Sequence, residues 1–434
     1  MKPGDKGWLR RYLNYRKRRL HLEQQVQLAS AAQNAEEFLY RMVQPTGLMY
    51  GYPLRAMDEV HPRFREWDEK ERTKILFTES CIHCGIYVYN KKNLLASSKQ
   101  LVFEQLVHDL RTFYSRTYSR YATVPKTLFG RKYNELERLE YILEHRISIR
   151  NDWSNFWTSF LQNSLLFFDL IYFMQWLSAE DKPDMQQIRQ HRQLTRMTLL
   201  KLIAAAAHSD KRVGREELNL YNFFLHSARL PPVQKKEARI FMEKGIHITD
   251  IDFSVLDSWI LKKYFMELAI LMIWADRNVS PVEIAFMRIL AKRFELPREE
   301  LEHSMIAIEG FVVEHWDQVH FLQQKQSYQV VSSRFVRRMG MIVRKNQKMI
   351  AQEIQESREL VSLLAKSRKK ALTAAEREKV REQLIDILKT IPAFALLLLP
   401  GSFLTLPILL RIIPKHILYP SSFLEDYREE NSQE

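Results

Sequence analysis

The feature that most constrains this chain is an apolar stretch of 21 residues without a charged side chain, which lies between Lys389 and Arg411. A helix of that length extends about 30 Å, the thickness of the hydrocarbon core of a bilayer. The stretch also contains three prolines, and each proline inside a helix costs about 3 kcal/mol in water. A bilayer tolerates such prolines where neighbouring groups satisfy the freed carbonyls. We therefore predict that the stretch inserts into a membrane, with a buried core segment as the alternative.

The predicted membrane segment is defined by Pro392, Phe394, Pro400, Pro407 and Pro414. The last three prolines recur every seven residues, so they would share one face of a helix and bend it. Basic residues flank the segment on both sides, and we expect them to lie at the lipid surface. They are Lys369, Lys370, Arg377, Lys389, Arg411 and Lys415.

Charge is distributed unevenly around this segment. From Arg334 to Lys389 there are 15 Lys or Arg against 7 Asp or Glu, a net charge of +8, whereas the residues after Leu410 carry three cations and five carboxylates. Positive residues favour the cytoplasmic side of a membrane. We therefore predict that the large N-terminal part of the chain stays in the cytoplasm, and a re-entrant segment would leave both of its ends there.

The sequence as a whole indicates an all-α protein. Only 11 glycines occur in 434 residues, and apolar residues recur at helical spacing over long stretches. The length allows two or three domains. We expect a helical N-terminal region (1–150), an apolar helix and boundary (151–190), a helical bundle with an internal repeat (191–310), a basic helical connector (311–371), the membrane segment (372–423) and an acidic tail (424–434).

A second apolar concentration runs from Trp153 to Leu177 and contains Asp169. A carboxylate in the middle of a membrane span costs a few kcal/mol. We therefore predict a buried or interfacial helix here, rather than a second span.

An internal repeat with an offset of 66 residues follows. It pairs Leu199–Pro232 with Tyr264–Glu299, and the shared frame is a helix, the pattern D-x-x-V-x-x-x-E, a second helix and Leu-Pro. Each copy is predicted to form a helical hairpin, and two such hairpins can bury their apolar faces against each other.

The repeat carries four carboxylates at matching positions: Asp210, Glu217, Asp276 and Glu283. The favoured interpretation is structural. Ser280 to Glu283 reads as a capping box with proline at the first helical position, and the aspartates can bond backbone amides in turns. Basic residues also stand where a calcium loop would need oxygen ligands.

The residues from Leu372 to Phe423 resemble the membrane segment of the leucine-zipper-EF-hand transmembrane (LETM) family. The resemblance is carried by L-T-x-x-E-R (Leu372 to Arg377), the proline-containing stretch, and P-S-S-F (Pro420 to Phe423). It implies a role near cation/proton exchange and ribosome contact. The chain ends soon after the motif, where that family continues into a large ribosome-binding-like domain.

The repeat resembles the TerB-like helical domain of bacterial tellurite-resistance and stress proteins, over about Leu194 to Glu302. In that family acidic residues at the positions of these four carboxylates are proposed to bind divalent metal, so the resemblance implies a Ca or Mg site formed by Asp210, Glu217, Asp276 and Glu283. Together the two resemblances point to a bacterial LETM-related, biofilm-associated protein, and they imply functions in envelope stress, cation homeostasis or biofilm formation.

The sequence contains no phosphate-binding glycine loop, no G-x-S-x-G and no H-E-x-x-H motif. Cys81 and Cys84 form a C-x-x-C pair, but no second pair completes a zinc site, so they are interpreted as ordinary thiols of a reducing compartment. No small-molecule substrate is identified.

We therefore predict a non-enzymatic scaffold or sensor tethered to lipid of the bacterial inner membrane, with the bulk of the chain in the cytoplasm. The net charge of +14 favours anionic partners without choosing among them. The alternatives are a subunit of a LETM-like cation/proton transporter, formed by self-association into a homo-oligomer, and a membrane protein that binds the ribosome, RNA or another protein.

Overall fold

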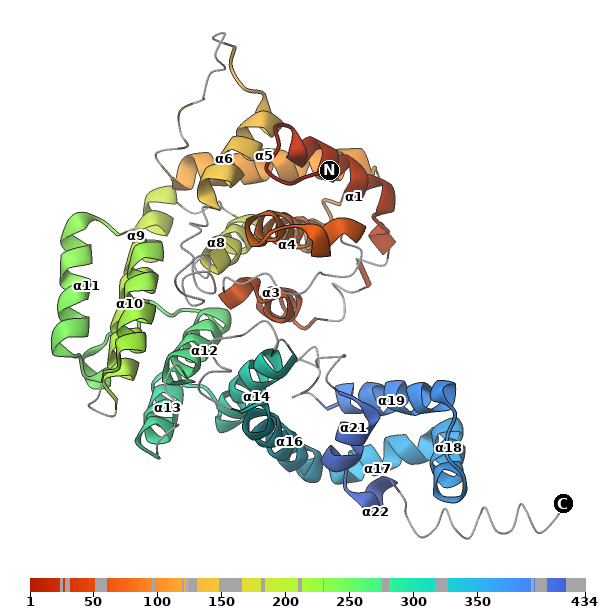
Figure 1. Cartoon of the computed structure of the whole chain (residues 1–434). Coiled ribbons are helices and arrows are strands. Elements are labelled where there is room, and N and C mark those ends of the chain that lie inside the picture. Colours follow the sequence, from red (N-terminus) through yellow and green to blue (C-terminus); the bar gives the residue numbers. More distant parts are fainter. Residues whose placement is uncertain are drawn as a thin grey trace. The chain divides into compact units, whose positions relative to one another are not determined.

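The computed structural model describes the chain except for a set of short segments. These are residues 24–25, 28–31, 51–60, 96–97, 119–120, 122, 124–130, 148–165, 181–183, 210–212, 229, 275–280, 315, 317–326, 392–393, 395–403 and 419–434. The predicted acidic tail and the start of the second apolar concentration therefore lie outside the described residues. Across the described ranges the regular structure is helical and contains no β-strand, which confirms the all-α class (Figure 1).

The chain forms two compact units, Met1–Leu296 (unit 1) and Pro297–Glu434 (unit 2). The helices of unit 1 are α1 (Trp8–Arg19), α3 (Ala35–Val43), η1 (Gln44–Thr46), η2 (Leu48–Tyr50), η3 (Pro62–Glu66), α4 (Glu69–Lys91), α5 (Lys99–Thr117), α6 (Glu135–Arg146), α8 (Leu166–Ser178), α9 (Met185–Ala207), α10 (Arg215–Ser227), α11 (Pro232–Lys244), η5 (Ile248–Asp250), α12 (Trp259–Trp274) and α13 (Pro281–Arg293).

Helix α4 lies at the centre of the first half of unit 1, in contact with α3, α5 and α8 (Figure 1). It begins with a capping box, in which Asp68 and Glu71 each accept a backbone hydrogen bond from the other. Every residue from Thr73 to Tyr89 is buried. A helix covered on all sides in this way has no polar face to reveal it in the sequence.

Helix α8 is the described part of the second apolar concentration. Nearly all of its side chains are buried, including Asp169, and it packs against α4 and α5 within unit 1. The prediction of a buried helix is therefore confirmed for these residues. The polar side chain is accommodated because it has buried partners, which are described below.

The second half of unit 1 is formed by α9 to α13. Helix α9 contacts α10, α11 and α12, and α12 also contacts α13. The buried faces consist mainly of aliphatic and aromatic side chains, such as Ile203 of α9, Phe224 of α10, Tyr264 of α12 and Leu290 of α13.

Unit 2 contains α14 (Arg298–Glu314), α16 (Tyr328–Lys345), α17 (Gln347–Glu356), α18 (Arg358–Lys369), α19 (Ala374–Lys389), α21 (Leu406–Ile412) and α22 (Lys415–Leu418). Helix α16 packs against α14 and α21, while α17, α18 and α19 contact one another. Thr373 caps α19, since its hydroxyl accepts from Glu376 N–H at 3.3 Å and Glu376 Oε2 accepts from Thr373 N–H at 2.9 Å.

Candidate functional site

Two of the four predicted carboxylates, Glu217 and Glu283, are buried at the third position of α10 and α13. Glu217 Oε2 accepts a hydrogen bond from the Gly214 N–H at 2.6 Å, which is the contact of a helix cap. Asp210 and Asp276 lie outside the described residues, so the four-carboxylate metal site stays a prediction. In the ranges that the structure describes, no cluster of three or more His, Cys, Asp or Glu could hold a metal ion.

The C-terminal apolar segment is broken in the part that the structure describes. Leu404 and Thr405 are not helical, and Thr405 has an extended backbone before α21. Pro407 occupies the first turn of α21, where its missing N–H costs nothing, and Pro414 separates α21 from α22. Pro392 and Pro400 lie outside the described residues. The expectation of one helix running from Lys389 to Arg411 is therefore not met, because α21 starts anew at Leu406.

In the described part of this segment and in α22, several apolar side chains are covered by protein. Phe394, Leu404, Leu409 and Leu418 are fully buried, and α21 packs against α16 and α19, while α22 packs against α17. A search of the described residues for a helix long and apolar enough to cross a bilayer found none. For the described part, the arrangement corresponds to the alternative of a buried core segment.

Most of the predicted basic residues are exposed. These are Lys370, Arg377, Lys389, Arg411 and Lys415, whereas the side chain of Lys369 lies outside the described ones. Lys389 Nζ is 2.8 Å from Asp386 Oδ1 on the same helix. Exposed pairs of this kind contribute little, so Lys389 remains available to an anionic surface.

Sequence analysis missed a face on α16 that carries both charge and apolar side chains. The helix buries Val331, Phe335, Met339 and Val343, which follow one another at intervals of four residues. The opposite face exposes Val330, Arg337, Met341, Arg344 and Lys345, and Lys348 continues it in α17. We call these six residues the α16 face. The four-residue interval of the buried stripe is visible in the sequence and could have revealed it.

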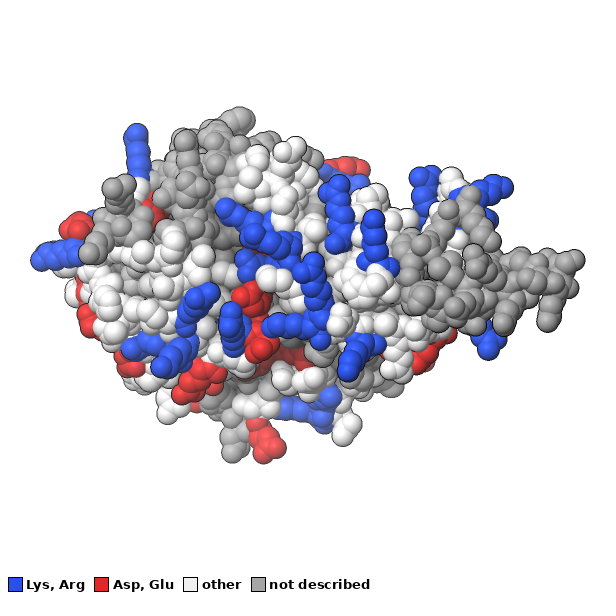
Figure 2. Space-filling view, turned by 90° about the horizontal axis from the view of Figure 1, so that it is seen from below, with Lys and Arg blue, Asp and Glu red and all other residues white. Residues whose placement is uncertain are grey.

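The cations of the α16 face differ from those of α18 and α19 in their ion pairing. Among the described residues, none of its four cations forms an ion pair. By contrast, Lys366 pairs with Glu376, Lys379 with Glu359 and Arg381 with Glu378, at 2.5 to 2.6 Å. Figure 2 shows Lys and Arg side chains gathered on the surface that it presents, with Asp and Glu between them.

Unit 1 contains a buried ionic cluster around Asp169. Its carboxylate accepts hydrogen bonds from Arg146 Nε at 2.6 Å, Tyr118 Oη at 2.6 Å and Tyr114 Oη at 3.1 Å. Arg192 Nη2 lies 3.7 Å from Asp169 Oδ1, whereas Arg146 donates to Oδ2. Burial alone would raise the pKa of Asp169, but Arg146 and Arg192 lower it to about 2.

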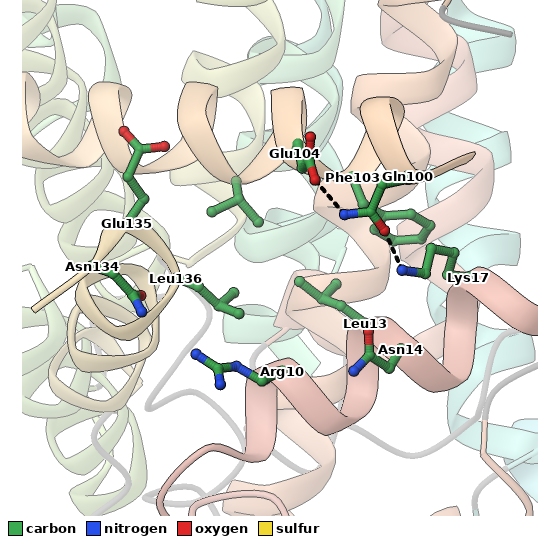
Figure 3. Close-up of a pocket in the computed structure, with 11 residues that line it drawn as sticks. Arg10, Leu13, Asn14, Lys17, Gln100, Phe103, Glu104, Asn134, Glu135 and Leu136 are labelled. Carbon is green, nitrogen blue, oxygen red and sulfur yellow. Dashed lines mark hydrogen bonds between the residues drawn. The ribbon is translucent and has the colours of Figure 1, made fainter. Parts of the chain in front are cut away.

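A pocket of about 430 Å³ lies among α1, α5 and α6 (Figure 3). Apolar side chains such as Leu13, Phe103 and Leu136 line it, with Arg10 and Lys17 on α1 and carboxylates on α5 and α6. Lys17 contacts Gln100, which contacts Glu104, and Glu135 pairs with Arg111 at 3.0 Å.

Cys81 and Cys84 are free thiols buried within α4. Burial raises the pKa of both thiols well above the ordinary value. A raised pKa keeps the thiols protonated, and the protonated form is a poor nucleophile and a poor metal ligand. This geometry agrees with their interpretation as ordinary thiols.

Comparisons with protein-family models, with curated proteins and with solved structures found no match to this chain. The described residues define an all-α protein in two helical units.

Proposed function

We propose that this protein is a non-enzymatic helical scaffold that binds the surface of an anionic membrane through unit 2, on the cytoplasmic side of a bacterial inner membrane. The observation that carries the proposal is the α16 face, which exposes Arg337, Arg344, Lys345 and Lys348 together with Met341 and Val330. Cations interleaved with exposed apolar side chains are characteristic of helices that lie at a lipid interface.

The expected electrostatic free energy favours binding of the α16 face at the membrane surface. Each Lys or Arg close to an anionic leaflet contributes about 1 kcal/mol, so four unpaired cations can contribute about 4 kcal/mol at low salt. Met341 is 46% exposed and Val330 is 45% exposed, so insertion of both side chains adds apolar burial. The charge term is screened within about 10 Å at 0.1 M salt, which makes binding sensitive to salt.

The apolar segment from Thr390 to Leu410 is a second proposed contact with lipid, as its resemblance to the LETM membrane segment implies. Since its described part packs inside unit 2, insertion would require α21 to leave α16 and α19. Surface binding through the α16 face requires no such rearrangement, and we therefore regard it as the primary contact.

The helix bounds support the proposed internal repeat of TerB-like type. Helices α10 and α13 begin 66 residues apart, at Arg215 and Pro281, and they also end 66 residues apart. Glu217 and Glu283 have the same place in these two helices and are both buried. We propose that the repeat provides a rigid helical docking module and that the two carboxylates cap its helices.

Binding of the full-length chain to lipid vesicles tests the proposal. We expect co-sedimentation with vesicles rich in phosphatidylglycerol, loss of binding on phosphatidylcholine vesicles, and weaker binding as salt increases. A triple variant with Arg337→Gln, Arg344→Gln and Lys345→Gln should bind about 100-fold more weakly, because it removes about 3 kcal/mol of attraction.

A matched control removes the same charge elsewhere on unit 2. Lys366→Gln, Lys379→Gln and Arg381→Gln change the net charge equally, but these cations already pair with carboxylates. Equal losses in both triple variants would show that net charge alone drives binding and would defeat the assignment to the α16 face. Binding to RNA at salt concentrations where the vesicles are not bound would favour the RNA alternative.

A further inference from the structure

Three arginines follow one face of α9. Arg189, Arg192 and Arg196 are spaced at i, i+3 and i+7, which places them on the same side of a helix. Arg189 is exposed, and its Nε donates to the Thr117 carbonyl at the end of α5, at 3.1 Å. Arg192 and Arg196 are buried. The three guanidinium groups therefore lead from the surface into the Asp169 cluster.

The cluster contains more positive than negative charge. Arg146, Arg192 and Arg196 are buried there, and in the described part of the chain Asp169 forms ion pairs with Arg146 and Arg192. Arg146 takes the short contact with that carboxylate, at 2.6 Å. Arg192 is left with the longer one, at 3.7 Å. A buried charge is costly unless it is paired and hydrogen-bonded, so two excess cations need an explanation.

Helix ends account for part of the excess. Arg196 Nη1 donates to the Ala228 carbonyl at the end of α10, at 3.2 Å, and Tyr118 follows the last residue of α5. The C-terminus of a helix carries about half a negative charge. The α10 end offsets about half a charge and the α5 end is shared with Arg189, so at least one cation of the cluster is left without a counter-charge among the described residues.

Two buried N–H donors of this cluster, one on Arg192 and one on Arg196, are left without a hydrogen-bond acceptor among the described residues. Both donors are Nε atoms. The guanidinium of Arg192 lies 4.0 Å from the centre of the Tyr118 ring, which provides a cation–π contact but no hydrogen bond. Burial and the neighbouring Arg192 lower the pKa of Arg196 to about 10, which reflects the cost of holding these cations together.

We propose that Arg192 and Arg196 form a binding site for a phosphate group, with Arg189 at its entrance. Phosphate presents several oxygens to guanidinium forks and carries enough charge to neutralise the excess. Tyr118 is only half-buried, so the cluster lies directly beneath the surface at the end of α5. The proposal concerns unit 1 and does not depend on membrane binding by unit 2.

Calorimetric titration of the full-length protein with inorganic phosphate, at constant ionic strength set by NaCl, tests the site. We expect saturable binding to the wild type and at least 10-fold weaker binding to Arg192→Gln. Arg192→Lys keeps the charge but loses the fork, and it should fall between the two. Arg293→Gln is the control, because Arg293 is a unit 1 cation that donates to backbone carbonyls at the surface.

A second readout separates ligand binding from a purely structural role. In phosphate-free NaCl the melting temperature of Arg192→Gln should equal or exceed that of the wild type, since the variant removes an uncompensated buried charge. A clear fall in melting temperature without phosphate would show a structural role and overturn the proposal. Equal phosphate affinity of Arg192→Gln and wild type, or no phosphate binding beyond the chloride control, would also overturn it.

The source of the phosphate group is identified by two further probes. Soluble glycerol phosphate should compete with inorganic phosphate if the ligand is a free metabolite-sized phosphate. Vesicles with phosphatidic acid should bind in a manner that depends on Arg192 if the ligand is a lipid headgroup, and this arm is measured in the variant that lacks the α16 cations, so that unit 2 does not contribute.

Discussion

Arg338 on α16 donates two hydrogen bonds to Glu309 on α14, from Nε to Oε2 at 3.1 Å and from Nη2 to Oε1 at 3.2 Å. Glu309 is almost fully buried, and Arg338 also donates to Glu302 at 2.6 Å. Loss of one partner from a buried pair leaves the other charge uncompensated, at a cost of about 3–5 kcal/mol. Arg338→Gln should therefore strongly destabilise unit 2.

The neighbouring Arg337 provides a control within the same turn, because it is exposed. Arg337→Gln should change the free energy of unfolding by no more than about 0.5 kcal/mol. Urea unfolding followed by circular dichroism measures both variants. If both had the same midpoint, the contact between α14 and α16 would not contribute to the stability of unit 2.

Asp169 predicts a specific loss of stability in acid. Its pKa is lowered from 3.8 to about 2 in the folded protein, because the buried arginines favour the ionised form against the opposing effect of burial. The carboxylate therefore contributes stability above about pH 4, and that contribution disappears as the pH falls toward 2. A shift of this size corresponds to about 2 kcal/mol.

Asp169→Asn should consequently be less stable than wild type at pH 6, and the difference should shrink as the pH is lowered. Thermal unfolding from pH 6 to pH 2.5 measures the effect. A difference that stayed constant over this range would mean that packing of the side chain, rather than its charge, determines the loss.

For Glu69 we expect the opposite dependence of stability on pH. Burial, with Asp68 adding to it against Arg72, raises its pKa from 4.5 to about 7. Between these values the unfolded chain releases a proton that the folded protein retains, so stability falls as the pH rises. Glu69→Gln should therefore be up to about 3 kcal/mol more stable than wild type at pH 8 and no more stable at pH 4. Glu66→Gln, on an exposed side chain, should show no such dependence in urea unfolding at the two pH values.

Local features of the fold could be predicted from the sequence, and long-range ones could not. The cap formed by Thr373 and Glu376 spans three residues, so its pattern is visible in the chain and the structure confirms it. The ion pair between Arg16 and Glu79 joins residues 63 positions apart, and no spacing rule links them. Helix α4 lies within the predicted helical region (1–150), but its bounds could not be predicted, since burial on every side removes the polar face by which a single helix is recognised.

The same distinction applies to the candidate sites. The count of charged residues indicated the basic stretch that contains Arg337. It could not distinguish this exposed cation from Arg338, which forms ion pairs with Glu302 and Glu309 of α14. Apolar composition suggested a membrane segment at Thr390 to Leu410, whereas in the described part of that segment α21 packs against α16 and α19. An apolar composition shows that a segment is unfavourable in water. Only tertiary contacts show whether it is buried by protein or by lipid.

The thiols of Cys81 and Cys84 should be unreactive in the folded protein. Both are fully buried in α4, and burial raises their pKa values, so thiolate is scarce at neutral pH and reagents have no access. Titration with a thiol reagent at pH 7.5 should label neither cysteine in native buffer and both in 6 M guanidinium chloride. Cys81→Ala and Cys84→Ala should each leave the net charge and the vesicle binding unchanged. Rapid labelling of one thiol in native buffer would instead indicate a reactive cysteine and would reopen a redox function for the C-x-x-C pair.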